Sequence, residues 1–188
     1  LHLFLNQEWK WKTIHGSNLS AFGNKPSKSH QKEYLDLATG QTSELLYKGL
    51  RPVGNTHKKI IKGKLVGGNL CMLTSGLGTS LQPNLSGKIL FLEEVGERGY
   101  RVDRMLEQML QSGVLNKKVK AIVLGDFTEA NEPNGKDLTM KAIQRLIARL
   151  DVPVFKGLKS GHGKINHPLV LNANVELDPV KGTLRFKF

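Results

Sequence analysis

The sequence of this chain predicts an α/β fold with a partly parallel sheet and antiparallel strands at its margins. Short apolar runs of strand length alternate with segments whose apolar residues recur at helical spacing, and this alternation gives two consecutive strand–helix–strand units. Consecutive units of this kind place their strands parallel in one sheet. Near the C-terminus, two further strand-like runs flank a turn, which adds antiparallel pairing at the edge of the sheet.

The first 60 residues are the least regular part of the chain. Residues 1–5 are mostly apolar and predict the apolar face of a helix that includes the first residues of the chain. Residues 15–30 are rich in Gly, Ser, Asn and Lys and predict a long surface loop. A short helix is expected through Tyr34 and Leu37, ending at Gly40. The regular alternation of strands and helices begins only at about Ile60.

The first strand–helix–strand unit starts with "KGKLVGG". We expect a strand there, a tight turn at Gly67-Gly68, and a helix that Asn69 opens as its N-cap. The next strand is "KILFLEEV" (88–95), an apolar run that ends in two acids and is typical of a buried strand.

The second unit continues from that strand. Residues 100–113 form an amphipathic helix closed by Gly113, followed by a buried strand at 120–127. Asp137 is expected to cap another helix, which ends before Pro153. The remaining strands are expected in the segments 153–158, 167–179 and 183–188.

Composition limits the classes of function. The formal charge is +12, from 28 Lys and Arg against 16 Asp and Glu, but the lysines are mostly scattered. No zinc-finger spacing or RNA-recognition aromatic motif accompanies them, so we predict a solubilising basic surface and no specific nucleic-acid partner. No apolar run is long enough for a membrane span, and no secretory leader is visible. The single Cys71 excludes an internal disulfide and suits a reducing, cytoplasmic compartment.

Three stretches place reactive side chains at the carboxyl ends of predicted strands, where ligands collect in parallel sheets. They are Glu93-Glu94, Gly125-Asp126 and the loop "KSGHGK" (159–164). The strand register should turn one of the two glutamates inward, where a carboxylate requires a partner. His162 lies between two glycines, which leaves its ring accessible. Neither a metal-ligand spacing nor a phosphate-loop spacing is present, so no cofactor and no metal are predicted.

A glutamate and a histidine at neighbouring strand ends make two thirds of a nucleophilic triad. The third member is not evident from the residues. Cys71 lies in an apolar helical segment and is expected in the core. Ser17 and Ser160 are possible nucleophiles, but neither lies in a GxSxG motif. The residues alone therefore predict an acid–base pair without a partner.

Four ordered segments of the sequence carry a resemblance. They are "GKLVGGNLCMLTSGLGT", "GKILFLEEVGERGYRVDRMLEQMLQSGVL", "AIVLGDF" and "VPVFKGLKSGHG". Together they resemble the LD-carboxypeptidase family, which comprises the muramoyl-tetrapeptide carboxypeptidases and the microcin C self-immunity peptidases. The match runs from about Lys62 to Asp178. The segments "LHLFLNQ" and "TIHGSNLSAF" also resemble this family, with Ser17 where many members have Pro.

The resemblance implies a two-domain Ser-His-Glu peptidase that removes terminal D-alanine from murein tetrapeptides in cell-wall recycling. Glu93 matches the acid and His162 the base of the family's triad. The Gly67–Asn69 turn is expected to help bind substrate. The family's nucleophilic Ser lies just before the segment that matches Leu1, in a separate N-terminal domain.

The resemblance also implies a division of the chain. Residues 1–60 are expected to be a remnant of the N-terminal domain with its linker, and 61–188 the C-terminal domain with the catalytic pair. This chain alone is expected to be an inactive peptidase, because the Ser is absent, and relatives suggest a cytoplasmic homodimer.

Three alternatives stay open at this point. The first is a microcin-type self-immunity peptidase. The second is a truncated, non-catalytic module that binds a partner or peptidoglycan fragments without cleaving them. The third is non-specific nucleic-acid binding driven by the +12 charge, which would show a steep dependence on salt.

Overall fold

A mixed sheet of eight strands organises the computed structural model, which describes residues 1–18, 20, 28–55 and 57–188. In the described part, the strand order is β2-β10-β9-β4-β5-β6-β7-β3. The four strands β4 to β7 are mutually parallel, and every other pairing in the sheet is antiparallel. The predicted parallel core with antiparallel margins is confirmed. The strands are β2 (Glu44–Lys48), β3 (Arg51–Val53), β4 (Ile61–Asn69), β5 (Ile89–Val95), β6 (Ala121–Thr128), β7 (Val154–Lys156), β9 (Asn174–Asp178) and β10 (Thr183–Lys187).

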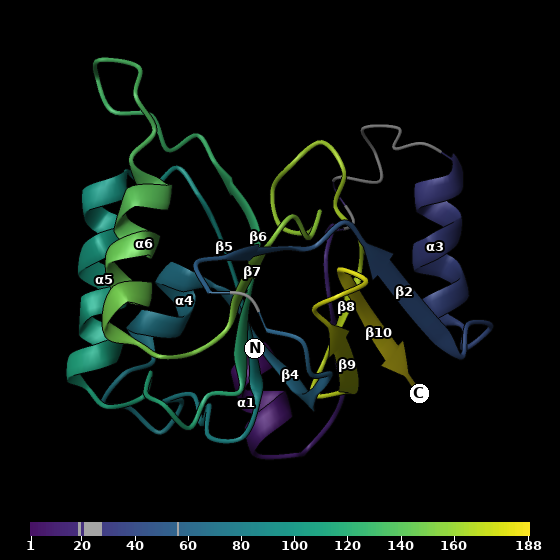
Figure 1. Cartoon of the computed structure of the whole chain (residues 1–188). Helices are drawn as coiled ribbons and strands as arrows, with labels where there is room; N and C mark the ends of the chain where they lie inside the picture. The colour runs from purple at the N-terminus through teal and green to yellow at the C-terminus, as the bar shows by residue number, and fades with distance from the viewer. Residues whose placement is uncertain (19, 21–27, 56) are drawn as a thin grey trace.

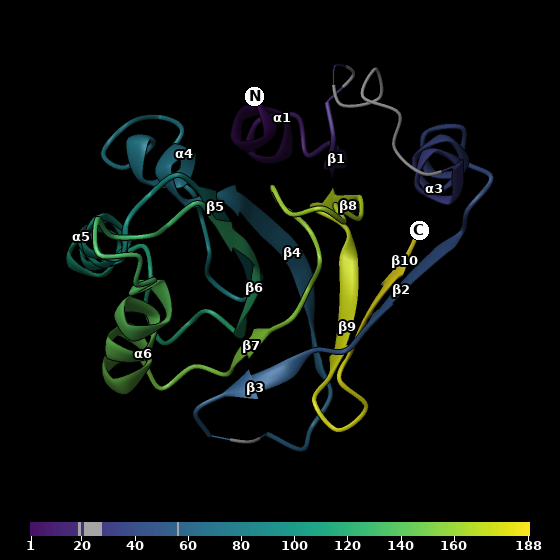
Figure 2. The same cartoon turned by 90° about the horizontal axis from the view of Figure 1, so that it is seen from above.

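The helices that join the parallel strands cover one face of the sheet. They are α4 (Leu70–Ser75), α5 (Gly99–Gln111) and α6 (Thr139–Arg149), which lie together on the outer side of β4 to β7 (Figures 1 and 2). The strands bury apolar side chains on both faces, as parallel strands do. One core cluster fills the space under the helices, and a second, which includes Phe91, Phe155 and Phe186, fills the opposite face.

The sheet curls until its two edges approach each other (Figure 2). Strands β2 and β3 lie at opposite ends of the strand order, yet only Gly49 and Leu50 separate them in the chain. This curl encloses the second core cluster. The prediction that regular strands begin only at about Ile60 is wrong, because β2 and β3 precede that residue, as does a three-residue strand at Thr13–His15.

The N-terminal segment contributes one strand to a second sheet, which has two strands in the described part of the chain. Helix α1 (His2–Gln7) leads into β1 (Thr13–His15), which pairs antiparallel with β8 (Leu169–Leu171). The predicted helix before Gly40 is α3 (Lys28–Ala38). Much of the predicted loop at 15–30 lies outside the described residues, and its last three residues belong to α3. The proposed boundary at residue 60 stays a prediction, although β2 and β3 share a sheet with later strands.

Most predicted elements after residue 60 are confirmed, with three corrections. The N-cap of α6 is Leu138 and not Asp137, although Asp137 Oδ1 accepts a hydrogen bond from Thr139 N at 2.8 Å. Asn69 is the N-cap of α4 and accepts a hydrogen bond from Met72 N at 3.1 Å. Gly67 and Gly68 form no turn, because both lie inside β4 with φ of +133°. Cys71 is exposed and does not belong to the core. The short helix α4 presents Cys71 and Met72 outward while Leu70 and Leu73 face the core.

Candidate active site

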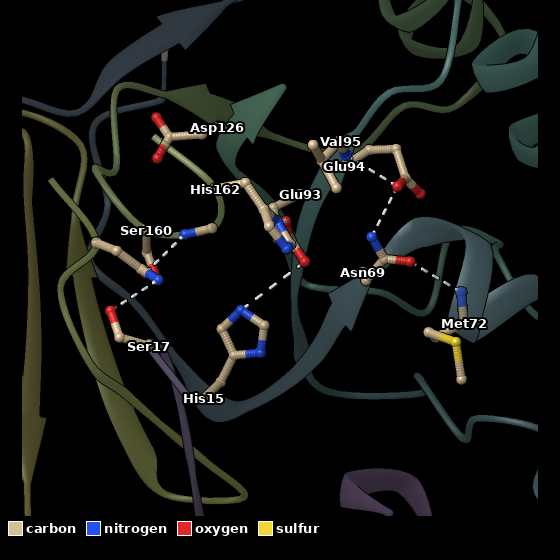
Figure 3. A network of polar contacts seen from close by, with 12 residues as sticks. His15, Ser17, Asn69, Met72, Glu93, Glu94, Val95, Asp126, Ser160 and His162 are labelled. Atoms are coloured by element: carbon tan, nitrogen blue, oxygen red, sulfur yellow. Dashed lines mark hydrogen bonds and ion pairs between the residues drawn. The ribbon is translucent and has the colours of Figure 1, made fainter. Parts of the chain in front are cut away.

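The predicted acid–base pair meets at the carboxyl ends of the parallel strands (Figure 3). Glu93 lies near the end of β5, and His162 lies in the loop that follows β7. His162 Nδ1 is 2.7 Å from Glu93 Oε2, a hydrogen-bond distance. The Glu93 side chain is fully buried, whereas 49% of the His162 side chain is exposed. The predicted contact between these two residues is confirmed.

The two adjacent glutamates of β5 are both buried, which corrects the expectation that only one turns inward. Glu93 faces His162. Glu94 faces the start of α4, where its carboxylate accepts hydrogen bonds from Asn69 Nδ2 at 2.7 Å, Cys71 N at 2.8 Å and its neighbour Val95 N at 2.9 Å. Glu94 therefore ties the first turn of α4 to the end of β5.

An irregularity between β5 and β6 opens the strand end at Glu93. Leu92 pairs with Leu124 and Glu94 with Phe127, so two β6 residues stand opposite Glu93 alone. This is the arrangement of a β-bulge, which re-aims side chains and is frequent beside active sites.

Two glycines allow the His162 loop to approach both strand ends. Gly161 has φ of +130°, and a Cβ there would lie 3.0 Å from Glu93 Cβ and Oε2. A Cβ on Gly163 would lie 2.6 Å from Asp126 Oδ2, the atom that accepts a hydrogen bond from Gly163 N at 3.2 Å. The glycines around His162 are therefore required by close packing.

Further hydrogen bonds close the loop on itself. His167 N donates to Lys159 O at 2.9 Å, and Gly161 N donates to Asn166 Oδ1 at 3.0 Å. Ser160 Oγ donates to His167 O at 2.9 Å. The loop is thus held at both ends, which fixes the position of the His162 ring.

Burial sets the electrostatics of the carboxylates. Desolvation raises the pKa of Glu93, while the hydrogen bond and charge of His162 oppose that rise. Desolvation likewise raises the pKa of Asp126, against the hydrogen bond from Gly163. The hydrogen bond to the ionised Glu93 fixes the His162 tautomer with its proton on Nδ1. Among the described residues, none forms a hydrogen bond with His162 Nε2.

His162 faces a cavity of about 930 Å³. The loop 159–167 forms one wall, and residues 15–18 with the start of α3 form the other. Lys159 and Lys164 add positive charge to it. A second histidine–carboxylate contact joins the two walls, where His167 Nδ1 is 2.9 Å from Glu33 Oε2.

The other predicted candidates take different places. Ser160 is fully buried. Ser17 lines the cavity, and its Oγ accepts a hydrogen bond from Asn166 Nδ2 at 3.4 Å. Gly67, Gly68 and Asn69 do not line the cavity, and both polar atoms of the Asn69 side chain bond within the fold. Their contact with substrate stays a prediction.

His15 is a site residue that sequence reasoning did not single out. Its Nε2 lies 3.9 Å from Glu93 Oε1, whereas His162 is bonded to the other oxygen of the same carboxylate (Figure 3). His15 belongs to a three-residue strand with no distinctive pattern, so only its presence in the segment "TIHGSNLSAF" could have drawn attention to it.

Two other kinds of site are absent from the described residues. No cluster of three or more His, Cys, Asp or Glu side chains is arranged to hold a metal ion. No described helix combines the length and the apolar character needed to cross a bilayer.

Comparison with known proteins places the chain in a family. Residues 62–177 match the model of the LD-carboxypeptidase C-terminal domain. A murein tetrapeptide carboxypeptidase of Pseudomonas aeruginosa is 33% identical over 159 residues, which is 81% of this chain and 52% of that protein. A Rickettsia conorii protein that bears a carboxypeptidase name is 41% identical over 94% of this chain and 55% of its own length.

Solved structures agree with this assignment. The crystal structure of muramoyltetrapeptide carboxypeptidase from Oxalobacter formigenes aligns with a TM-score of 0.78 at 31% identity, over 98% of this chain and 62% of that one. The microcin C7 self-immunity protein MccF shares the fold, with a TM-score of 0.84 at 19% identity over 99% of this chain and 63% of its own. The chain spans about half the length of the curated relatives it matches. It belongs to the LD-carboxypeptidase family, of which it carries the C-terminal domain.

Proposed function

We propose that this chain supplies the base and the acid of a serine-type LD-carboxypeptidase. The enzyme would release terminal D-alanine from murein tetrapeptides during cell-wall recycling. One observation carries the proposal: a fully buried carboxylate, Glu93, lies 2.7 Å from a half-exposed imidazole, His162, that faces a cavity. The names of the relatives supply the substrate class.

In this proposal His162 moves protons through Nε2. Nε2 takes the proton of the serine hydroxyl as its oxygen attacks the carbonyl carbon of the scissile bond. The same proton then passes to the amine of the departing D-alanine, which leaves an acyl-enzyme. Water attacks that ester by the same route, with Nε2 as base. Glu93 holds the ring through Nδ1–H and stabilises the imidazolium that forms in each step.

The nucleophile is proposed to come from a polypeptide segment outside these 188 residues, in an N-terminal domain. Ser160 is unsuitable, because its hydroxyl is buried and bonded to the carbonyl of His167. Ser17 Oγ already accepts a hydrogen bond from Asn166. The chain alone is therefore proposed to be inactive. A homodimer, a cytoplasmic location and substrate contact near Gly67–Asn69 complete the proposal.

A fusion protein tests this function. Residues 1–188 would be joined to the N-terminal domain of the Oxalobacter formigenes enzyme, and D-alanine release from a murein tetrapeptide would be measured. We expect release by the fusion protein and none by the chain alone. His162→Ala and Glu93→Gln should lower kcat/KM by about 10²–10⁴-fold. His57→Ala is the matched control, because His57 does not line the cavity.

Two results would contradict the proposal. One is a folded fusion protein that releases no D-alanine, or releases it equally well without His162. The other is release by the chain alone, which would direct attention to Ser17. An additional substrate, aspartyl sulfamoyl adenosine, which is named in a structure of MccF, tests the microcin-type alternative. Cleavage of that compound in preference to the tetrapeptide would favour the alternative.

A further inference from the structure

One oxygen of the central carboxylate has no hydrogen bond. Glu93 Oε2 is bonded to His162, but Glu93 Oε1 is buried and forms no hydrogen bond with a described residue. A buried carboxylate oxygen without a donor costs free energy, and such atoms are rare in folded proteins. We therefore expect a hydrogen-bond donor near Glu93 Oε1.

His15 is placed to be that donor. Strand pairing opposite Leu169 directs the ring of His15 towards β5, where Phe91 packs against it with ring centroids 5.3 Å apart. Only 14% of the side chain is exposed. Its Nε2 is 3.9 Å from Glu93 Oε1, about 1 Å beyond a hydrogen bond. A small movement of β1 or of the Glu93 side chain would close that gap.

The contact involves a neutral imidazole. Burial, together with the charges of His2 and His162, lowers the pKa of His15 to about 4. At neutral pH the ring therefore carries one proton, on one nitrogen. A carboxylate oxygen opposite Nε2 favours the tautomer with the proton on Nε2. Besides His15, the charged or titratable groups around Glu93 are His162 and Glu94. The side-chain amide of Asn69 also lowers the pKa of Glu93, although its hydrogen bond at 2.7 Å is donated to Glu94 Oε1.

We propose that His15 is a positioning residue, whose Nε2–H is donated to Glu93 Oε1 so that the carboxylate is held between two imidazoles. His15 would hold Oε1, and His162 is bonded to Oε2. With both oxygens bonded, Glu93 stays ionised and its side chain keeps a single orientation. Any effect of His15 on catalysis rests on the function proposed above, but the interaction itself does not.

A simpler role for His15 would be packing alone. In that case an apolar ring of similar size would replace it without consequence for Glu93. The two roles are separated by His15→Phe, which keeps a ring and removes the donor, and His15→Gln, which keeps an N–H donor near the position of Nε2.

Carbon-13 NMR titration of the Glu93 carboxyl in the 188-residue chain tests the proposal. We expect His15→Phe to raise the pKa of Glu93 further, because the ionised form loses a donor, and His15→Gln to leave it near the wild-type value. Glu176 serves as the internal control, because the hydrogen bond from Lys62 that lowers its pKa lies on strands β4 and β9, away from His15. An unchanged Glu93 titration in His15→Phe would overturn the proposal.

Nitrogen-15 shifts of the His15 ring provide a measurement that needs no variant. We expect the proton on Nε2 at neutral pH, and a proton on Nδ1 would overturn the proposal even if both variants failed to fold. Neither measurement uses peptidase activity. An inactive fusion protein would therefore count against the proposed function alone, and a negative NMR result against the role of His15 alone.

Discussion

The adjacent glutamates of β5 should differ in how much stability the protein loses when each is replaced by Gln. Glu94 accepts three hydrogen bonds, from two backbone N–H groups and the Asn69 amide. In Glu94→Gln one side-chain oxygen remains, so at best the two bonds at Oε1 survive and Cys71 N faces an NH₂ group. Loss of a hydrogen bond to a charged group costs about 1.5–3 kcal/mol, and the unsatisfied donor adds to it. We expect the free energy of unfolding to fall by about 2–4 kcal/mol.

Glu93→Gln is the matched comparison. Burial raises the pKa of Glu93, which means that the fold disfavours its ionised form, and its Oε1 has no hydrogen bond with a described residue. A neutral amide of nearly the same shape removes that cost, and a neutral imidazole beside it can change tautomer and accept a hydrogen bond from the new NH₂ group. We expect a change within about 1 kcal/mol or a small stabilisation, as is common where a site holds a residue for function.

Urea denaturation at pH 7, followed by circular dichroism, measures both variants. The m-values should match the wild type, so that the midpoints report stability alone. If Glu93→Gln lost as much stability as Glu94→Gln, the assignment of a structural role to one glutamate and a functional role to the other would be wrong.

Three further outcomes follow from the geometry. Burial lowers the pKa of His15 from 6.5 in the unfolded chain to about 4 in the folded chain, so the contribution of its neutral ring to the free energy of unfolding is complete above pH 6.5. That free energy should fall by up to about 3 kcal/mol as the pH drops to 4. Urea denaturation should show a smaller loss in His15→Phe than in the wild type, and equal losses would refute this. Gly161→Ala should lower the free energy of unfolding by about 1–3 kcal/mol because of the positive φ, and by more because the new Cβ contacts Glu93. Gly113→Ala is the milder control, since Gly113 has a φ of +72° and open space around it. Equal losses of stability in the two variants would contradict the packing argument. Cys71 is exposed, so a thiol reagent should modify it in the folded chain at a rate within about tenfold of the rate in the unfolded chain. Protection of Cys71 until the chain unfolds would instead support the prediction of a core cysteine.

The parallel core could be predicted because each of its strands carries its own signal. Strands buried on both faces need continuous apolar runs, and "ILFLEEV" and "AIVLGDF" are such runs. The meeting of Glu93 and His162 followed from the same topology, because the carboxyl ends of parallel strands share one rim.

The remaining features depend on partners that are distant in the sequence. Strand β2 pairs with β10 and strand β3 pairs with β7, and each is too short to carry a strong local pattern. The burial of Glu94 depends on where the first turn of α4 lies relative to β5. The position of His15 depends on the pairing of β1 with β8. None of these contacts between segments distant in the sequence can be inferred from the spacing of apolar residues.

Glu93 and His162 are proposed to activate a serine that lies outside these 188 residues. The most direct measurement is the rate at which a fluorophosphonate labels the fusion protein, with the modified residue located by mass spectrometry. We expect one labelled serine in the N-terminal domain, and labelling slowed by about 10²–10⁴-fold in His162→Ala. Labelling at Ser17 or Ser160, or an unchanged rate without His162, would contradict the claim.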